Sequence, residues 1–372
     1  MGNPDMFFAG DVKRGRRTLA GDDAWLDHFL AATVASGHPG FLTLDGGMPN
    51  ALRSYYMLQQ LHSRYCLTNA DSIRYADAEG RLLDTTAAVA SGAYRRSQVV
   101  TRYADGTITA VNGHPEERLR VRAFGRDIDL PPHGYAGWTE DGAIEVISGD
   151  RDGHRADHAA TPAYLYVDGR GRFTRFATAA SDGIGICRLL PDGAAEVIPV
   201  GGADCGFAFE AASAVALDRD NREIGPAALR RSRGLTHVVP VTNAFSYRLA
   251  PGPAAGRGLT CTRDAVVPGE TVVVKGRERH TFTVPADAPP GRRLWQTFEG
   301  AWIDFTVVPL VDTEVSLTSP GDVRGGPASV PAAARSEPRP PAAARTGDTL
   351  SIALTSHRSE EHTSELQSRQ SI

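Results

Sequence analysis

Apolar residues recur at helical spacing near the start of the chain. A helix is predicted from Asp22 to Gly37, because apolar positions there follow i, i+3, i+4, i+7 and i+8, with Asp22 as the N-cap. The residues in this stripe are Leu26, Phe29, Leu30, Thr33 and Val34. The stripe would face a core.

A short apolar run, Gly40 to Leu44, then predicts a buried strand that ends in the glycine-rich loop after Asp45. A second helix is predicted from about Asn50 to Thr68. Its apolar side consists of Met57, Leu58, Leu61 and Tyr65. A strand followed by a helix is one unit of an α/β fold. With a possible strand over 6–9, we interpret 1–71 as the C-terminal fragment of a (β/α) barrel whose earlier strands are missing.

The pattern changes from helical to alternating after Ser72. Asp-Gly pairs between β-prone runs favour hairpins, because both turn positions tolerate positive φ. These pairs begin at Asp105, Asp141, Asp168 and Asp192. Repeated hairpins predict an antiparallel β-sandwich over 72–250, with possible helical turns at 213–217 and 226–229.

Composition and pattern divide the C-terminal third of the chain into four segments. Strands separated by Pro-Gly turns predict an immunoglobulin-like β-sandwich over 259–317. The Pro, Ala and Arg-rich stretch 318–347 is typical of a disordered linker. Residues 348–357 would start a truncated module. Residues 358–372 resemble the translation of a common sequencing adapter, so we expect this stretch to be an artefact and the authentic protein to end, in this sequence, near His357.

Composition excludes several classes of protein. The 372 residues carry a net charge of -4, which gives no electrostatic footprint for nucleic acid. We expect no membrane span, because no window approaches ~18 consecutive apolar residues, and the first residues do not form a signal peptide. No P-loop, dinucleotide fingerprint or G-x-S-x-G occurs, so no organic cofactor is expected.

Four cysteines are too widely spaced for a C-x-x-C zinc site. We interpret them as buried thiols. Cys187 and Cys205 lie in neighbouring predicted strands, and they could form a disulfide in an exported protein.

One region resembles a known class of protein. The segment RYADGTITAVNG, followed by LPPHGYAGW, resembles the region after the catalytic barrel in large bacterial glycoside hydrolases and their uncharacterised relatives. The resemblance covers about Trp25 to Trp138. It implies a barrel end followed by a β-sandwich, in a protein that is extracellular or periplasmic in its full-length form.

Glycoside hydrolysis generally needs two carboxyl groups that flank the scissile bond, supplied in a barrel by the carboxyl ends of different strands. Asp11 and Asp45 follow predicted strands and are the candidate substrate-binding residues, although Asp45 before two glycines is more typical of a turn. His38 is interpreted as structural. The catalytic acid and base are therefore expected on strands that precede this sequence.

A calcium site is a weak candidate at Asp150 and Asp152, which lie near His154, Asp157 and His158. The third acidic ligand and closing Glu of an EF-hand are missing, so we favour a charged surface loop.

Four aromatic residues could stack on sugars, but they are more simply explained by burial within the strands. They are Tyr164, Tyr166, Phe173 and Phe176. Trp295 and Trp302 are likewise expected first in a sandwich core.

The function predicted from the sequence is a truncated piece of a carbohydrate-active enzyme that hydrolyses glycosidic bonds, inactive as it stands. The alternative is a non-catalytic β-sandwich that binds glycans or acts at a cell surface. Both functions make a carbohydrate the expected partner. If the first 68 residues pack completely against the first sandwich, the alternative gains.

Overall fold

The computed structural model describes residues 23–40, 47–151, 153–252, 259–291, 293–298 and 301–309, together with the backbone of two strands at 313–317 and 352–356. These residues fall into two units, divided between Val308 and Pro309. The protein is mainly β, as predicted, and its largest sheet is antiparallel throughout. The predicted strands at 6–9 and 40–44 lie almost entirely outside the described residues.

Two long helices form where the sequence predicts them. They are α2 (Asp23–Ser36) and α3 (Gly47–Tyr65). The predicted stripe of α2 is buried from Leu26 to Val34, and so are the four predicted apolar residues of α3. The sequence therefore placed the apolar faces of both helices correctly.

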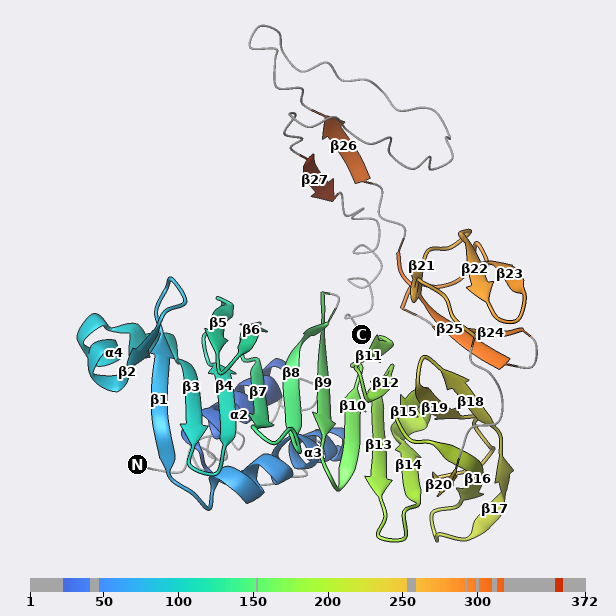
Figure 1. Ribbon diagram of the computed structural model, residues 1–372, viewed down its shortest axis with the longest axis horizontal. Helices are drawn as coiled ribbons and strands as arrows, with labels where there is room; N and C mark the ends of the chain where they lie inside the picture. The colour runs from blue at the N-terminus through green and yellow to red at the C-terminus, as the bar shows by residue number, and fades with distance from the viewer. Residues whose placement is uncertain are drawn as a thin grey trace, which may run out of the picture. The chain divides into compact units, whose positions relative to one another are not determined.

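A sheet of thirteen strands forms the centre of the first unit (Figure 1). The chain adds most of the strands as consecutive antiparallel hairpins, and the two edges are β17 and β2. In spatial order the strands are β17 (Glu223–Ala227), β16 (Ala211–Leu217), β20 (Ser246–Pro251), β14 (Ala195–Pro199), β13 (Ile184–Leu189), β10 (Tyr164–Asp168), β9 (His154–Ala160), β8 (Glu145–Arg151), β7 (Tyr135–Thr139), β4 (Thr107–Asn112), β3 (Gln98–Tyr103), β1 (Ala70–Ala76) and β2 (Leu82–Asp84).

The two long helices cover one face of this sheet. Their apolar stripes pack against alternate residues of the central strands, including Val111, Tyr135, Tyr164 and Tyr166, in one continuous core. Only alternate residues of each strand contact the helices, because successive side chains of a strand point to opposite faces of the sheet. The described part of the N-terminal region is thus packed on the sheet, and the barrel end stays a prediction.

The opposite face is covered by β-structure. At one end lies a five-stranded sheet, with a core that includes Leu165, Val167, Cys187 and Val197. Its strands, in spatial order, are β11 (Thr174–Arg175), β12 (Ala179–Ser181), β15 (Cys205–Phe207), β19 (Leu235–Val238) and β18 (Leu229–Ser232). Towards the other end lies the hairpin of β5 (Leu119–Ala123) and β6 (Arg126–Leu130), which covers Val100, Ile108 and Trp138.

Short helical segments complete this region. They are α4 (Thr85–Ser91), η1 (Ala93–Arg96) and η2 (Val200–Gly202). Asp84 caps α4, because its side chain accepts a hydrogen bond from the backbone of Ala87 at 2.8 Å.

Two expectations for the sheet region were wrong. Residues 213–217 and 226–229 were predicted as possible helical turns, but they lie in β16, β17 and β18, because pairing with neighbouring strands overrides the helical preference of alanine. Asp168-Gly169 was predicted to turn a hairpin. The chain instead leaves the large sheet after β10 and enters the five-stranded sheet at β11.

A small β module follows within the first unit. Its strands are β21 (Ala265–Val266), β22 (Thr271–Lys275), β23 (Arg279–Thr283), β24 (Arg293–Phe298) and β25 (Ala301–Val307). Its core includes Val272, Val274, Ile303 and Phe305. The immunoglobulin-like assignment of this module stays a prediction.

The second unit contains one described antiparallel pair, β26 (Thr313–Leu317) with β27 (Ile352–Ser356). The strand predicted within 348–357 therefore exists, and it pairs with residues 313–317, which were assigned to the preceding module but lie in the second unit.

Candidate functional site

Charged residues are buried between the two helices and the sheet. Asp27 on α2 and Asp157 on β9 each contact the same two arginines, Arg53 on α3 and Arg170 from the turn after β10. Arg53 Nε lies 2.7 Å from Asp157 Oδ2, and Arg170 Nη2 lies 2.7 Å from Asp27 Oδ1 and 2.8 Å from Asp157 Oδ2. We call these four residues the Asp-Arg cluster.

The turn after β10 explains how Arg170 reaches this cluster. Arg170 has a φ of +48°, and its backbone N–H donates to Asp168 Oδ1 at 2.8 Å. Gly169 precedes it where a Cβ would lie 2.1 Å from the carbonyl oxygen of Ser181, so only glycine fits there. The Asp-Gly pair that resembles a hairpin turn thus directs an arginine inward.

Burial decides the protonation chemistry of the Asp-Arg cluster. It raises the pKa of Asp157 to about 6, against the opposing effect of Arg53, and it also raises the pKa of Asp27. Asp157 is 0 % exposed, so no substrate can reach its carboxylate. The cluster can hold the helices on the sheet, but it offers no accessible acid or base.

The candidate residues from the sequence do not come together in the described structure. Asp11, Asp45 and Asp152 lie outside the described residues. Asp150 pairs with Arg118, with 2.5 Å between Oδ2 and Nη1. Within the described ranges, no group of three or more His, Cys, Asp or Glu side chains could hold a metal ion. Asp157, expected in a surface loop, is instead buried in the Asp-Arg cluster.

Four of the aromatic residues and two of the cysteines considered from the sequence are buried, as its simpler interpretation predicts. Tyr164 and Tyr166 are buried beneath α3, where the ring of Tyr166 stacks on Tyr56 at 5.5 Å. Cys187 and Cys205 are buried, free thiols, and burial raises the pKa of Cys187 to about 12. Tyr164, Tyr166, Phe173 and Phe176 therefore form no exposed sugar-stacking face, since all four are at most 8 % exposed.

The residues that carry the family resemblance have structural roles. Asp105-Gly106 forms the predicted β3–β4 turn, in which Gly106 has a φ of +80°. Asn112 at the end of β4 is fully buried, and its Nδ2 lies 2.8–3.0 Å from three carbonyl oxygens, of Glu117, Leu130 and Pro131. Asn112 of the VNG motif therefore holds the loop after β4 to the LPP segment. Neither motif defines a reactive site.

A cleft of about 860 Å³ lies where α3 meets one end of the sheet. Its lining includes apolar residues such as Met48, Tyr56 and Val200, together with polar and charged residues. The full lining is Met48, Leu52, Tyr56, Ile186, Ile198, Pro199, Val200, Gly201, Gly202, Asp218, Arg219, Asp220, Asn243, Ala244 and Phe245. We call this hollow the α3 cleft. Two of its apolar side chains face solvent, because Met48 is 58 % and Phe245 is 46 % exposed.

Two connections form the rim of the α3 cleft. The backbone N–H of Phe245 donates to the carbonyl of Leu217 at 2.7 Å, which joins the segment before β20 to the turn between β16 and β17. Asn243 occupies the left-handed region, with a φ of +63°. An exposed aromatic ring and amide and charged groups therefore converge on one hollow, an arrangement typical of a small-molecule site.

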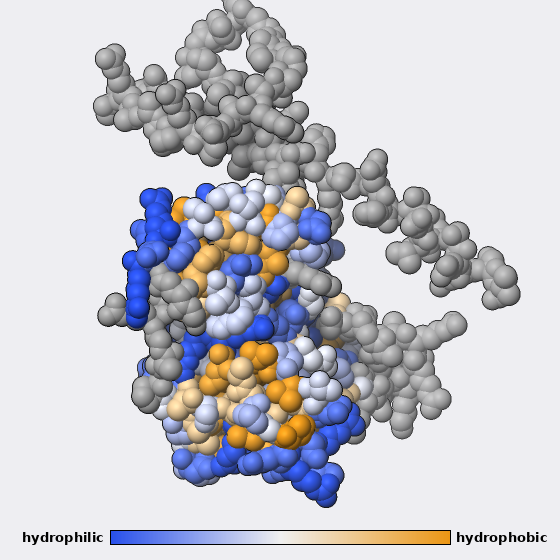
Figure 2. Space-filling model, turned by 90° about the vertical axis from the view of Figure 1, so that its right-hand side faces the viewer, coloured by the Kyte–Doolittle hydropathy of each residue, from blue (hydrophilic) through white to orange (hydrophobic). Residues whose placement is uncertain are grey.

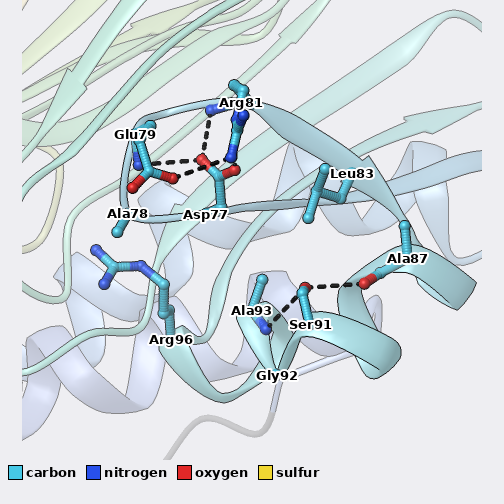
Figure 3. Close-up of a pocket in the computed structure, with 10 residues that line it drawn as sticks. All are labelled: Asp77, Ala78, Glu79, Arg81, Leu83, Ala87, Ser91, Gly92, Ala93 and Arg96. Carbon is cyan, nitrogen blue, oxygen red and sulfur yellow. Dashed lines mark hydrogen bonds and ion pairs between the residues drawn. The ribbon is translucent and has the colours of Figure 1, made fainter.

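A second hollow, of about 650 Å³, lies between the β1–β2 turn and α4 (Figure 3). Its charged groups already have ion-pair partners. Arg81 Nε lies 2.7 Å from Asp77 Oδ2, and Arg96 pairs with Glu117 at 2.5 Å. We therefore regard the α3 cleft as the better candidate.

A third group of charges lies where the small module meets the five-stranded sheet. The side chain of Arg293 is 3 % exposed, and its guanidinium lies between the rings of Trp295 and Phe173, at 3.8 and 4.2 Å from the ring centroids. Its guanidinium contacts Asp304 at 2.8 Å and Asp204 at 3.1 Å. This contact is structural, because its carboxylates are already paired.

Sequence reasoning missed the α3 cleft, because its residues come from five separate segments without a motif. The feature that marks the cleft is the solvent exposure of Met48 and Phe245, and the hydrophobic pattern of the sequence does not reveal it. Comparisons of the chain with protein-family models, with curated proteins and with solved structures found no match. No helix in the described ranges is long and apolar enough to cross a membrane.

Proposed function

We propose that this chain is a non-catalytic, glycan-binding part of a carbohydrate-active protein, and that the sugar lies in the α3 cleft. The observation that carries the proposal is that the exposed side chain of Phe245 lines the same cleft as apolar residues of α3 and β14 and as the polar residues Asn243 and Asp218. A sugar ring has an apolar C–H face and polar edges, so it fits a site that pairs an aromatic face with hydrogen-bonding groups.

The packing of the helices supports this alternative over catalysis. Asp27 and Asp157 are two carboxylates that lie close together, but both are bound by arginines beneath α2 and α3. General acid and base catalysis needs carboxyl groups that reach the glycosidic oxygen and a water or sugar carbon. The Asp-Arg cluster cannot do this.

Binding of a glycan panel to the full chain, measured by calorimetry, tests the proposal. Phe245→Ala should weaken binding about 10-fold, the effect of losing roughly half the burial of a phenylalanine side chain. Phe124→Ala is a matched control, because Phe124 is 43 % exposed and lies in the β5–β6 turn, outside the cleft. Equal losses in both variants, or no binding by the unmodified chain, would refute the proposal.

A second candidate is a piece of a glycoside hydrolase, the function first predicted. The observation that favours it is the order of α2, the apolar run 41–44 and α3, which agrees with the predicted unit of a barrel. Its catalytic carboxylates would lie outside the described residues. Release of reducing sugar from glycosides by the chain would favour this candidate over binding alone.

A further inference from the structure

The charges around the α3 cleft are unequally paired. The carboxylate of Asp218 accepts hydrogen bonds from the backbone N–H groups of Asp220 and Arg222, at 2.9 and 2.8 Å. Asp220 pairs with Arg222 at 3.1 Å. Arg219 also lines the cleft and is exposed, and its guanidinium has no hydrogen-bond or ion-pair partner among the described residues. Arg219 therefore supplies a guanidinium that can pair with an anionic group of a ligand, beside the carboxylate of Asp218, which keeps its negative charge.

The turn that carries Arg219 is held in place. The N–H of Asp218 donates to the carbonyl of Arg222 at 2.9 Å, and the N–H of Asn221 donates to the carbonyl of Asp218 at 3.1 Å. The same turn is joined to Phe245 through Leu217. These hydrogen bonds join the backbone of the turn that carries Arg219 to the backbone of Phe245, and both residues line the cleft.

We propose that the α3 cleft selects an acidic sugar, whose ring lies against Phe245 and whose carboxylate pairs with Arg219. This inference rests on the proposed glycan binding. A guanidinium presents two parallel N–H donors to a carboxylate, and its stem adds apolar contact. A neutral sugar would leave this cation without a counter-charge, whereas a hexuronic acid supplies one.

The test compares oligogalacturonate with the neutral galactose oligosaccharide of the same length, using calorimetry on the full chain at low and at physiological salt. We expect the acidic ligand to bind about 10-fold more tightly at low salt, and the difference to shrink as salt rises. Arg219→Gln should remove the preference, so that the acidic and the neutral ligand bind with equal affinity.

Arg248→Gln is the matched control, because Arg248 is an exposed arginine of β20 that does not line the cleft. It should retain the preference. Equal affinity for both ligands in the unmodified chain, or a preference that survives Arg219→Gln, overturns this inference and leaves glycan binding standing. Binding of neither ligand overturns both.

Discussion

Replacement of Arg53 by methionine tests the role of the Asp-Arg cluster most directly. Arg53 connects both long helices and the sheet, because it extends from α3 to Asp27 on α2 and to Asp157 on β9. Methionine retains much of the volume of the side chain and removes its charge. Arg53→Met therefore separates electrostatics from packing.

The charge balance gives the expected magnitude. Three buried or nearly buried aspartates, Asp27, Asp157 and Asp168, lie near three arginines, Arg53, Arg155 and Arg170, so the group as described is neutral. Removing Arg53 leaves one negative charge uncompensated at a site where Asp157 has no contact with water. Loss of one partner of a buried pair costs about 3–5 kcal/mol of unfolding free energy.

Urea unfolding followed by circular dichroism measures this loss, and amide hydrogen exchange over Leu26–Val34 shows whether α2 separates from the sheet. The double variant Arg53→Met with Asp157→Asn restores neutrality and should be less destabilised than the sum of the single changes. Arg248→Gln, which breaks an exposed pair with Asp192, should cost under ~1 kcal/mol.

The pH dependence of the variant follows from the same reasoning. Burial holds the pKa of Asp157 at about 6, and loss of Arg53 raises it further. A carboxyl with a raised pKa binds more protons in the folded than in the unfolded state, so it gains stability as pH falls. The deficit of Arg53→Met should therefore shrink between pH 7.5 and 5.5. A deficit near that of Arg248→Gln, or one that grows with acid, would refute the reasoning.

Three further outcomes are expected. Asn112→Ala should lower the unfolding free energy by about 2–4 kcal/mol in urea titrations, because it leaves buried carbonyls without a donor; a loss below 1 kcal/mol would contradict this role. Burial lowers the pKa of His158 to about 4, so the unfolded form binds the proton first, and His158 should contribute a loss of up to ~3 kcal/mol of stability from pH 6.5 to 4. The contribution is the difference in pH dependence between the unmodified chain and His158→Gln, and equal pH dependence in both would contradict it. Arg293→Gln should accelerate hydrogen exchange in β24 and β25, because Asp304, 1 % exposed, loses a partner, and unchanged exchange would count against the role of this contact.

The parts of the fold that depend on local periodicity were predictable. The stripe of α2 and the Asp-Gly turns after Tyr103, Thr139 and Leu190 are visible within short windows, because helix and strand repeat every 3.6 and 2 residues. Residues 213–217 were misread because alanine favours a helix in isolation. Their strand conformation depends on partners about 30 residues further on, in β20.

The candidate sites were not predictable, because their residues lie far apart in the sequence. Asp27 and Asp157 are 130 positions apart, and no spacing rule connects them to Arg53 or to Arg170. Asp157 was placed in a charged surface loop because its neighbours are polar, yet the strand alternation of β9 turns its side chain towards the helices. The α3 cleft likewise exists only after α3, β14 and the connections before β17 and β20 have been assembled.

The edges of the thirteen-stranded sheet bear on how the protein behaves among copies of itself. Figure 2 shows apolar side chains gathered on the face that is turned to the right in Figure 1, so association is a hazard there. The edge strand β17 contains Pro226, which offers no amide hydrogen to an incoming strand, and the other edge, β2, is three residues long. Neither edge is a good template for strand addition, so a sheet this long resists growing into a fibril.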